Sequence, residues 1–287
     1  KIDKLASGEK EWILTSGWNK SVMNADDYRA YVGGTSGLIY GYVNDGFYKV
    51  EDFEYFDSKS RTWKLKEGVV DSSPLSDTPR PGNAKFKKLT PVDPNSSNPY
   101  QLTEADRTVI GNTTPKFSGG FGLNATYKGF DLSMFFNFMY DFDVFNANKV
   151  MLTTWADNHE NNFGMEVASD KRWRNFDDMG NEIRYSPELL AEFNKNATMW
   201  NPTSIGKPIS MSYAVEDGSF LRLNSATLGY TLPQEWTKKA GLNKVRFYVA
   251  GSNLFTITGY SGYDPEVDIA TGLTPNIDNN RYPRSRT

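Results

Sequence analysis

Two stretches of strict alternation, 117–127 and 130–140, constrain the fold more than any other part of the sequence. In the first, every second position from Phe117 to Tyr127 is apolar or glycine, and serine, glycine, asparagine and threonine lie between. In the second, every even position from Phe130 to Tyr140 is apolar. Strand side chains alternate between two faces, so both stretches predict strands with one apolar face. Lys128 and Gly129 between them predict a two-residue hairpin turn, because glycine readily adopts a positive φ.

This pattern is compatible with two kinds of protein. In a transmembrane β-barrel, strands of ~9–11 residues place an apolar face against lipid and a polar face against an aqueous lumen. In a soluble β-sandwich, the same apolar face lies under a second sheet. The alternation alone does not decide between a barrel and a sandwich.

Composition excludes several kinds of site. The 287 residues contain no cysteine and one histidine, His159, and carry a net charge of −3. Disulfides, thiolate metal sites and sites built on two histidines are therefore excluded, and a structural role is expected for His159. The charge provides no basic field for nucleic acid. No apolar run approaches the ~18–20 residues of a membrane helix. The sequence starts at Lys1 without a signal peptide, and we expect it to be part of a longer protein.

Other strands are predicted at 11–19, within 38–48, and at 219–232 and 245–257, from alternating or aromatic-rich residues. A compact connection with one helical turn is expected at 233–243. Ser186 followed by Pro187 predicts the start of a helix. Long loops are predicted at about 51–110, 141–211 and 258–287. If the tight turn at 128–129 faces the periplasm, all three loops fall on the opposite, extracellular side, as barrels of this kind require.

Two groups of residues in these loops are candidate ligand contacts. Trp155, Trp173 and Trp200 lie in the second loop and could stack on a substrate. The alternative is that they stabilise the fold of the loop itself. Asp93, Asn95, Ser97 and Glu104 occupy positions 1, 3, 5 and 12 of a loop that resembles a calcium site with oxygen ligands. An ordinary turn rich in Asp and Asn is the alternative, since Asn98 stands where such a loop usually has glycine.

Several motifs follow one another in a characteristic order. They begin with Arg80-Pro81-Gly82-Asn83-Ala84-Lys85-Phe86, Glu104-Ala105-Asp106-Arg107-Thr108-Val109-Ile110-Gly111-Asn112 and Thr114-Pro115-Lys116-Phe117. They continue with Tyr127-Lys128-Gly129-Phe130-Asp131-Leu132 and a block from Gly218 to Val267. In this order they resemble the SusC/RagA family of TonB-dependent outer-membrane receptors. Within the motifs, we expect structural roles for Gly111, Pro115, Gly129, Asp131, Gly218, Arg222, Leu223, Gly229, Tyr230, Asn253, Leu254, Phe255, Gly262, Tyr263, Asp264, Pro265 and Glu266.

The resemblance implies an all-β fold in which 1–287 is the C-terminal portion of a 22-stranded barrel, a size known among outer-membrane transporters. The N-terminal plug and the final strand would lie outside this chain. The implied location is the outer membrane of a Gram-negative cell. The implied function is uptake of glycans or peptides together with a SusD-like surface lipoprotein, energised by the TonB–ExbB–ExbD complex. Neither a catalytic residue nor a cofactor is implied, apart from the possible Ca²⁺.

Two other functions are weighed against this one. A soluble β-sandwich that binds carbohydrate would share the alternating strands. A glycoside hydrolase would need two carboxylates held on opposite sides of a scissile bond. The sequence contains many acidic residues but no ordered catalytic constellation, so we predict no enzymatic activity.

Overall fold

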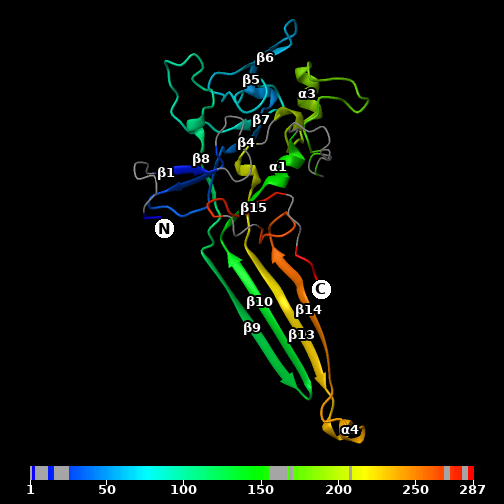
Figure 1. The fold of residues 1–287 in the computed structure, drawn as a ribbon. Coiled ribbons are helices and arrows are strands. Elements are labelled where there is room, and N and C mark those ends of the chain that lie inside the picture. Colours follow the sequence, from blue (N-terminus) through cyan, green and yellow to red (C-terminus); the bar gives the residue numbers. More distant parts are fainter. Residues whose placement is uncertain are drawn as a thin grey trace.

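The computed structural model describes residues 2–3, 12–15, 26–154, 164, 167, 171–206, 209–267, 272–279 and 284–287. The molecule is elongated: a long four-stranded sheet carries a cluster of short strands and helices at one end (Figure 1). No helix within the described residues is long and apolar enough to cross a membrane.

The long sheet contains β9 (Phe117–Tyr127), β10 (Phe130–Tyr140), β13 (Phe220–Thr231) and β14 (Arg246–Thr258). The strands lie in the order β14-β13-β10-β9, and every pair is antiparallel. These are the four strands predicted at 117–127, 130–140, 219–232 and 245–257, so that prediction is confirmed within one residue. Lys128 and Gly129 have φ values of 46° and 89° and form the expected tight turn.

The connections sort by length between the two ends of the sheet (Figure 1). At one end lie the 128–129 turn and the 232–245 connection, which contains α4 (Gln234–Lys239) as its predicted helical turn. At the other end lie the segment before β9, the long connection between β10 and β13, and the segment after β14. The predicted separation of short and long connections is therefore confirmed for the described residues.

Two register irregularities interrupt the ladder, one between Phe135 and Phe136 and one between Leu223 and Ser225. Asn253, with φ 51°, lies opposite the second irregularity. An inserted residue of this kind resets the alternation of side chains and increases the twist. As a result, Phe136, Leu223 and Phe255 remain paired on one face.

The cluster at the other end contains small sheets. One has the order β1-β2-β3-β8, a second has the order β12-β11-β15, and two further sheets pair β4 with β7 and β5 with β6. The strands are β1 (Trp12–Thr15), β2 (Tyr28–Tyr31), β3 (Leu38–Gly41), β4 (Asn44–Phe47), β5 (Phe53–Asp57), β6 (Thr62–Leu65), β7 (Ala84–Phe86), β8 (Thr108–Asn112), β11 (Asp143–Asn146), β12 (Val215–Asp217) and β15 (Ile277–Asp278). Among the described residues, this cluster also contains the helices α1 (Ala147–Thr153) and α3 (Pro187–Phe193) and 3₁₀ turns at Val50–Asp52, Glu104–Asp106, Pro202–Ser204 and Ser212–Ala214.

The main hydrophobic core lies in this cluster and not in the long sheet. Its buried residues come from segments far apart in the sequence, including Ile39, Phe86, Phe145, Trp200 and Ile277. The three predicted long loops therefore fold together around a shared core and are not independent excursions from the sheet.

Two parts of the sequence interpretation need correction or limitation. The stretch 38–48 forms two separate four-residue strands, β3 and β4, and not one strand. The chain turns away between them because the backbone of Tyr42 bonds to Ser210 and Ser212 of another segment. The segment 51–110 is mostly loop, as predicted, and the short strands β5, β6, β7 and most of β8 lie within it. Of the strand predicted at 11–19, Trp12–Thr15 is described, and the rest lies outside the described residues.

Candidate functional site

The long sheet has one continuous apolar face. Cross-strand partners on this face include Phe136 with Phe121, Leu132 with Leu228, and Leu228 with Val249. Many of these side chains are exposed to solvent, namely those of Phe117, Phe121, Leu123, Tyr127, Phe130, Tyr140, Leu228, Phe247, Val249, Phe255 and Ile257. An exposed apolar area of this extent is typical of a surface that contacts lipid or another protein.

The opposite face is polar and is crossed by an ion pair near the short turns. Arg246 on β14 binds both carboxylate oxygens of Asp131 on β10, at 3.0 and 2.5 Å. The side chain passes over β13 at Gly229, where a Cβ atom would lie 2.4 Å from Arg246 Nη2 and 2.6 Å from Asp131 Oδ1. Glycine at this position leaves room for the ion pair to span three strands, and a Cβ atom there would push the two charged groups aside.

A second charged cluster lies on the polar face at the opposite end of the sheet. Arg222 of β13 is 2% exposed, and its Nη2 lies 2.5 Å from Asp264 Oδ1 and 3.7 Å from Glu266 Oε2. Arg284 donates to Glu266 Oε1 at 2.9 Å. Asp264 also accepts a hydrogen bond from the backbone N–H of Glu266 at 2.9 Å. This cluster joins a strand to two distant parts of the following loop.

The electrostatics of Asp264 follow from these partners. Burial by itself raises the pKa of this carboxyl. The hydrogen bonds from Arg222 and from the backbone N–H of Glu266 lower the pKa by more, so that it lies below its usual value. Asp264 is therefore ionised at neutral pH and holds the loop after β14 against the end of β13.

A cavity of about 480 Å³ opens beside this cluster on the polar face. It is lined by Arg222, Asn253, Thr256, Tyr263 and Arg284, among others. Buried Arg222 Nε and Asn253 Oδ1 have no hydrogen-bond partner among the described residues. Seven of the lining residues lie within the Gly218–Val267 motif block, so the block surrounds a polar recess as well as stabilising the loop.

The predicted tryptophans are positioned as follows. Trp200 is 2% exposed, and its indole N–H donates to the Thr153 carbonyl oxygen at 3.1 Å. Trp173 is 4% exposed and packs edge-on against Phe47 in a small core with Ile183 and Leu190. Trp155 lies outside the described residues. The two described indoles thus support the loop fold, which is the alternative role considered from the sequence.

Trp173 nevertheless also borders a cavity of about 490 Å³ near the tip of the cluster. Arg172, Arg174, Arg184 and Phe176 line the same cavity. Arg174 is paired with Asp178 at 2.7 Å, and Arg184 is paired with Glu182 at 2.5 Å. Trp173 therefore borders a cavity, whereas Trp200 is sealed in the main core.

The predicted calcium loop is built as a turn. Asp93 Oδ1 accepts the backbone N–H of Asn95 at 2.9 Å, which is the usual arrangement of an Asx turn. Glu104 begins a 3₁₀ turn, and Ser97 is exposed. Within the part of the chain that the structure describes, no group of three or more acidic, histidine or cysteine side chains could hold a metal ion. The four residues show no preformed ion site, and calcium binding there stays a prediction.

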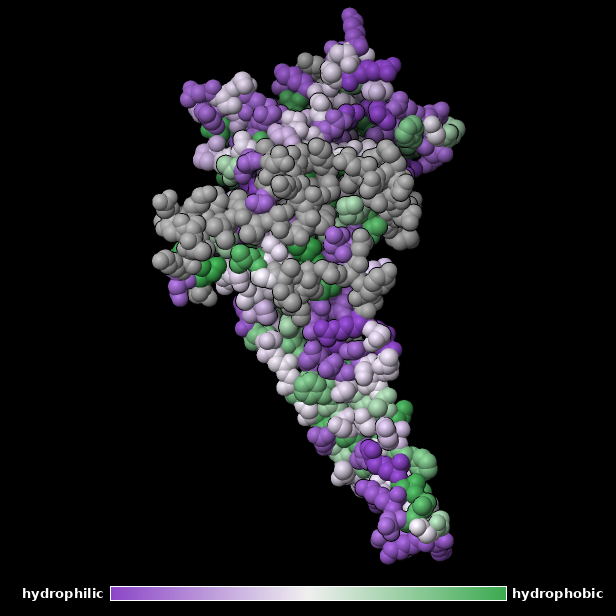
Figure 2. Space-filling model, viewed as in Figure 1, coloured by the Kyte–Doolittle hydropathy of each residue, from purple (hydrophilic) through white to green (hydrophobic). Residues whose placement is uncertain are grey.

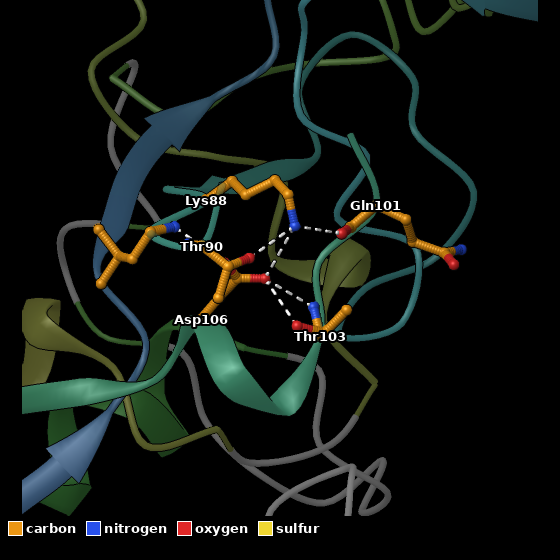
Figure 3. A network of polar contacts seen from close by, with 6 residues as sticks. Lys88, Thr90, Gln101, Thr103 and Asp106 are labelled. Carbon is orange, nitrogen blue, oxygen red and sulfur yellow. Dashed lines mark hydrogen bonds and ion pairs between the residues drawn. The ribbon is translucent and has the colours of Figure 1, made fainter. Parts of the chain in front are cut away.

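A different acidic residue of the same segment is the organising one. Asp106 is fully buried, and its two oxygens accept hydrogen bonds from Leu89, Thr90 and Thr103 at 2.7–3.0 Å. Lys88 Nζ lies 3.4 Å from Asp106 and donates to the Gln101 carbonyl oxygen at 3.1 Å (Figure 3). Burial alone would raise the pKa of Asp106, but these hydrogen bonds lower it to about 2. The ionised carboxylate of Asp106 therefore holds the two ends of the 88–106 loop together.

Comparisons with known proteins place this geometry in a family. The chain is 32% identical over 257 residues to the TonB-dependent receptor P3 of Formosa agariphila, covering 88% of this chain and 21% of P3. It is 38% identical over 77 residues to the TonB-dependent receptor SusC of Bacteroides thetaiotaomicron, covering 26% of this chain and 7% of SusC. The chain is homologous to TonB-dependent receptors. The resemblance seen in the sequence is therefore confirmed.

Solved structures agree on the fold of this receptor chain. It superposes on the RagAB peptide transporter with a TM-score of 0.63 and 21% identity, covering 98% of this chain and 24% of that one. The 'closed-closed' state of the RagAB peptide importer gives a TM-score of 0.59 at 20% identity. No family model matches the chain. The receptor chain spans about a fifth of the length of P3, and its long sheet is open, so barrel closure and the number of 22 strands stay predictions.

Sequence reasoning missed three residues that organise these sites: Arg284, Arg246 and Asp106. A usable signal existed for Arg246, because it starts a predicted strand on the same polar face as Asp131. Apart from Thr103, which lies three residues before Asp106, the partners of Asp106 and Arg284 are 16 to 20 residues away, and no periodicity connects them.

Proposed function

We propose that this chain forms part of the barrel wall and the extracellular loops of a SusC-like outer-membrane importer. The homologues are named as receptors and, for RagAB, as a peptide transporter, which supports uptake and not catalysis. The observation that carries the proposal is the exposed apolar face of the long sheet. In a soluble sandwich these side chains would lie under a second sheet, and none of the described residues forms such a cover.

The orientation follows from the connections. Tight turns at one end of the sheet face the periplasm, and the folded cluster at the other end faces the cell exterior. The polar face, with the Asp131–Arg246 pair and the cavity beside Arg222, then lines the lumen.

Within this arrangement the cluster captures an oligosaccharide or a peptide. A SusD-like lipoprotein acts on the extracellular side, and the TonB–ExbB–ExbD complex supplies energy through parts of the full-length protein that lie outside this chain. The kinship with SusC and the RagAB fold supports such a partner. Trp173, at the edge of an arginine-lined cavity, is the better placed of the described tryptophans to contact the substrate; Trp155 stays a candidate, and so does a Ca²⁺ ion near Asp93.

The experiment compares two neighbouring positions near the middle of β9 in the full-length protein. Leu123 lies on the apolar face and is exposed, whereas Asn124 lies on the polar face. An arginine on the lipid face near the bilayer centre costs about 2–4 kcal/mol, and one facing the lumen is tolerated. We expect Leu123→Arg to reduce the heat-modifiable, outer-membrane fraction strongly and Asn124→Arg to leave it close to that of the wild type.

A wild-type protein that is soluble and shows no heat-modifiable band would overturn the proposal and favour the carbohydrate-binding sandwich. Equal loss with Leu123→Arg and Asn124→Arg would show that the two faces do not differ in their contact with lipid, and would also overturn it.

A further inference from the structure

The turn end of the long sheet carries positive charge that no ion pair among the described residues neutralises. Lys128 lies in the hairpin turn, and Lys238, Lys239 and Lys244 lie in the connection between β13 and β14. All four are exposed, and none forms an ion pair with another described residue. The fifth basic residue here, Arg246, is already paired with Asp131.

This concentration contrasts with the rest of the chain. The whole sequence has a net charge of −3, yet around the turn end Glu235 is the one acidic side chain left to oppose four lysines once Asp131 is counted with Arg246. A local excess of this sign creates a positive potential that extends about one Debye length, roughly 8–10 Å, into solvent.

The same connection exposes large apolar side chains. Trp236 in α4 is 61% exposed, and Leu242 is 50% exposed. In Figure 2 the lowest end of the molecule is hydrophilic, and hydrophobic residues lie directly above it. Tryptophan and lysine together are typical of the boundary between hydrocarbon and headgroups, because the indole tolerates both environments and the ammonium group reaches outward.

The residues at both ends of the connection between β13 and β14 continue the apolar face of the long sheet. Leu232 donates its backbone N–H to Val245 at 3.0 Å, which extends the ladder by one pair beyond Thr231 and Arg246. The alternation that places Tyr230 and Phe247 on the apolar face also places Leu232 and Val245 there. The connection therefore leaves the sheet from the edge of the surface that contacts lipid.

We propose that the four lysines, with Trp236 and Leu242, bind the phosphate groups of anionic phospholipids in the leaflet on the turn side of the membrane. This inference rests on the proposed function, because it requires the apolar face to lie in a bilayer. The lysines supply the attraction and the two apolar side chains set the depth of the connection at the headgroups. The site would anchor the short connections and fix the tilt of the adjacent strands.

The test measures lipid binding to the purified full-length protein by native mass spectrometry in mild detergent. Phosphatidylglycerol is the probe, and phosphatidylcholine, with a phosphate but no net charge, is the comparison. The variant Lys238→Gln/Lys239→Gln removes two charges at the turn end. The matched control, Lys59→Gln/Lys66→Gln, removes two exposed lysines in the cluster at the opposite end.

Since each basic residue near an anionic surface contributes about fivefold, we expect the Lys238/Lys239 variant to bind phosphatidylglycerol at least tenfold more weakly. The control should match the wild type, and phosphatidylcholine binding should be unaffected by either variant. If the Lys238/Lys239 variant does not fold, Lys128→Gln/Lys244→Gln should show the same selective loss.

Equal phosphatidylglycerol binding by wild type and turn-end variants, or equal loss in the control, would overturn the inference while the protein still migrates as a heat-modifiable barrel. A wild-type protein without heat-modifiable migration would instead refute the proposed function. The two failures are thus distinguishable in the same preparations.

Discussion

Replacing Arg222 by methionine is the most informative single change, because it leaves two carboxylates in a buried setting. In this variant Asp264 Oδ1 loses the Arg222 Nη2 group that lies 2.5 Å away, whereas Glu266 Oε1 keeps its ion pair with Arg284 Nη2 at 2.9 Å. Removing one partner of a buried ion pair costs about 3–5 kcal/mol. Asp264 retains the backbone N–H of Glu266 as a donor, so we expect the lower end, about 3 kcal/mol. At about 1.4 kcal/mol per factor of ten, this is roughly a hundredfold in the local opening equilibrium.

The assay is hydrogen exchange with mass spectrometry of the full-length protein, followed on peptides that cover 258–267. We expect Arg222→Met to accelerate exchange there about a hundredfold, or to the fully exposed limit, at neutral pH. Arg172→Met is the matched control, because Arg172 is exposed and belongs to no described ion pair. The double variant Arg222→Met/Asp264→Leu should recover much of the protection, since apolar replacement of a whole pair is often close to neutral.

The pH dependence provides a second test. In the wild type the pKa of Asp264 is lowered, so its stabilising effect is present above the unfolded-state pKa of about 3.9 and is lost as pH falls through the folded value. Without Arg222, burial should raise that pKa, and protonation should relieve the unpaired charge. The difference between variant and wild type should therefore shrink from pH 7 to pH 4. A difference that is absent at pH 7, or that grows on acidification, would refute the reasoning.

Two further predictions concern the other charged contacts. Gly229→Ala should displace Arg246 from Asp131 and slightly lower the urea concentration at which the heat-modifiable band is lost. Little further loss is expected when Asp131→Asn is added, because exposed ion pairs contribute little. An additive loss would contradict the proposed role of the glycine. Asp106→Asn should destabilise the 88–106 loop by about 2–3 kcal/mol. The NH₂ group of asparagine is a donor, so it would face N–H and O–H groups that are also donors and that would lose their acceptor. Limited proteolysis of this loop should show the effect above pH 4 and a diminishing difference as pH falls towards 2, the pKa of Asp106; a constant difference would argue against an ionised Asp106.

The long sheet could be predicted from the sequence because its determinants are local. The alternation from Phe117 to Tyr140 and the Lys128-Gly129 turn define both strands and their register without reference to the rest of the chain. Period two and a positive φ at glycine are properties of the residues themselves. The same holds for α3, which begins at Pro187 after Ser186 as predicted, although the Ser186 hydroxyl makes no capping hydrogen bond.

The folded cluster could not be predicted in the same way, because its elements depend on distant partners. β3 and β4 are four residues long, and β11 pairs with β15 more than a hundred residues away. Trp173 illustrates the limit. Its sequence context is that of an exposed loop, but Gly82, about ninety residues earlier, lies directly against its indole and helps to bury it. An aromatic residue in a long loop therefore carries no reliable information on exposure until the contacts of that loop are known.

The charged motif residues gain their meaning from the same long-range geometry. Arg222, Asp264 and Glu266 were recognised from the sequence as parts of motifs, and structural roles were expected for them, but their partners could not be assigned. In the structure Arg222 is buried against both carboxylates, and Arg284 pairs with Glu266. A catalytic acid needs access to a substrate and a raised pKa, whereas Asp264 has a lowered one. The cluster therefore fastens the loop after β14 to the end of β13, and in the proposed importer this attachment would hold that loop beside the lumen.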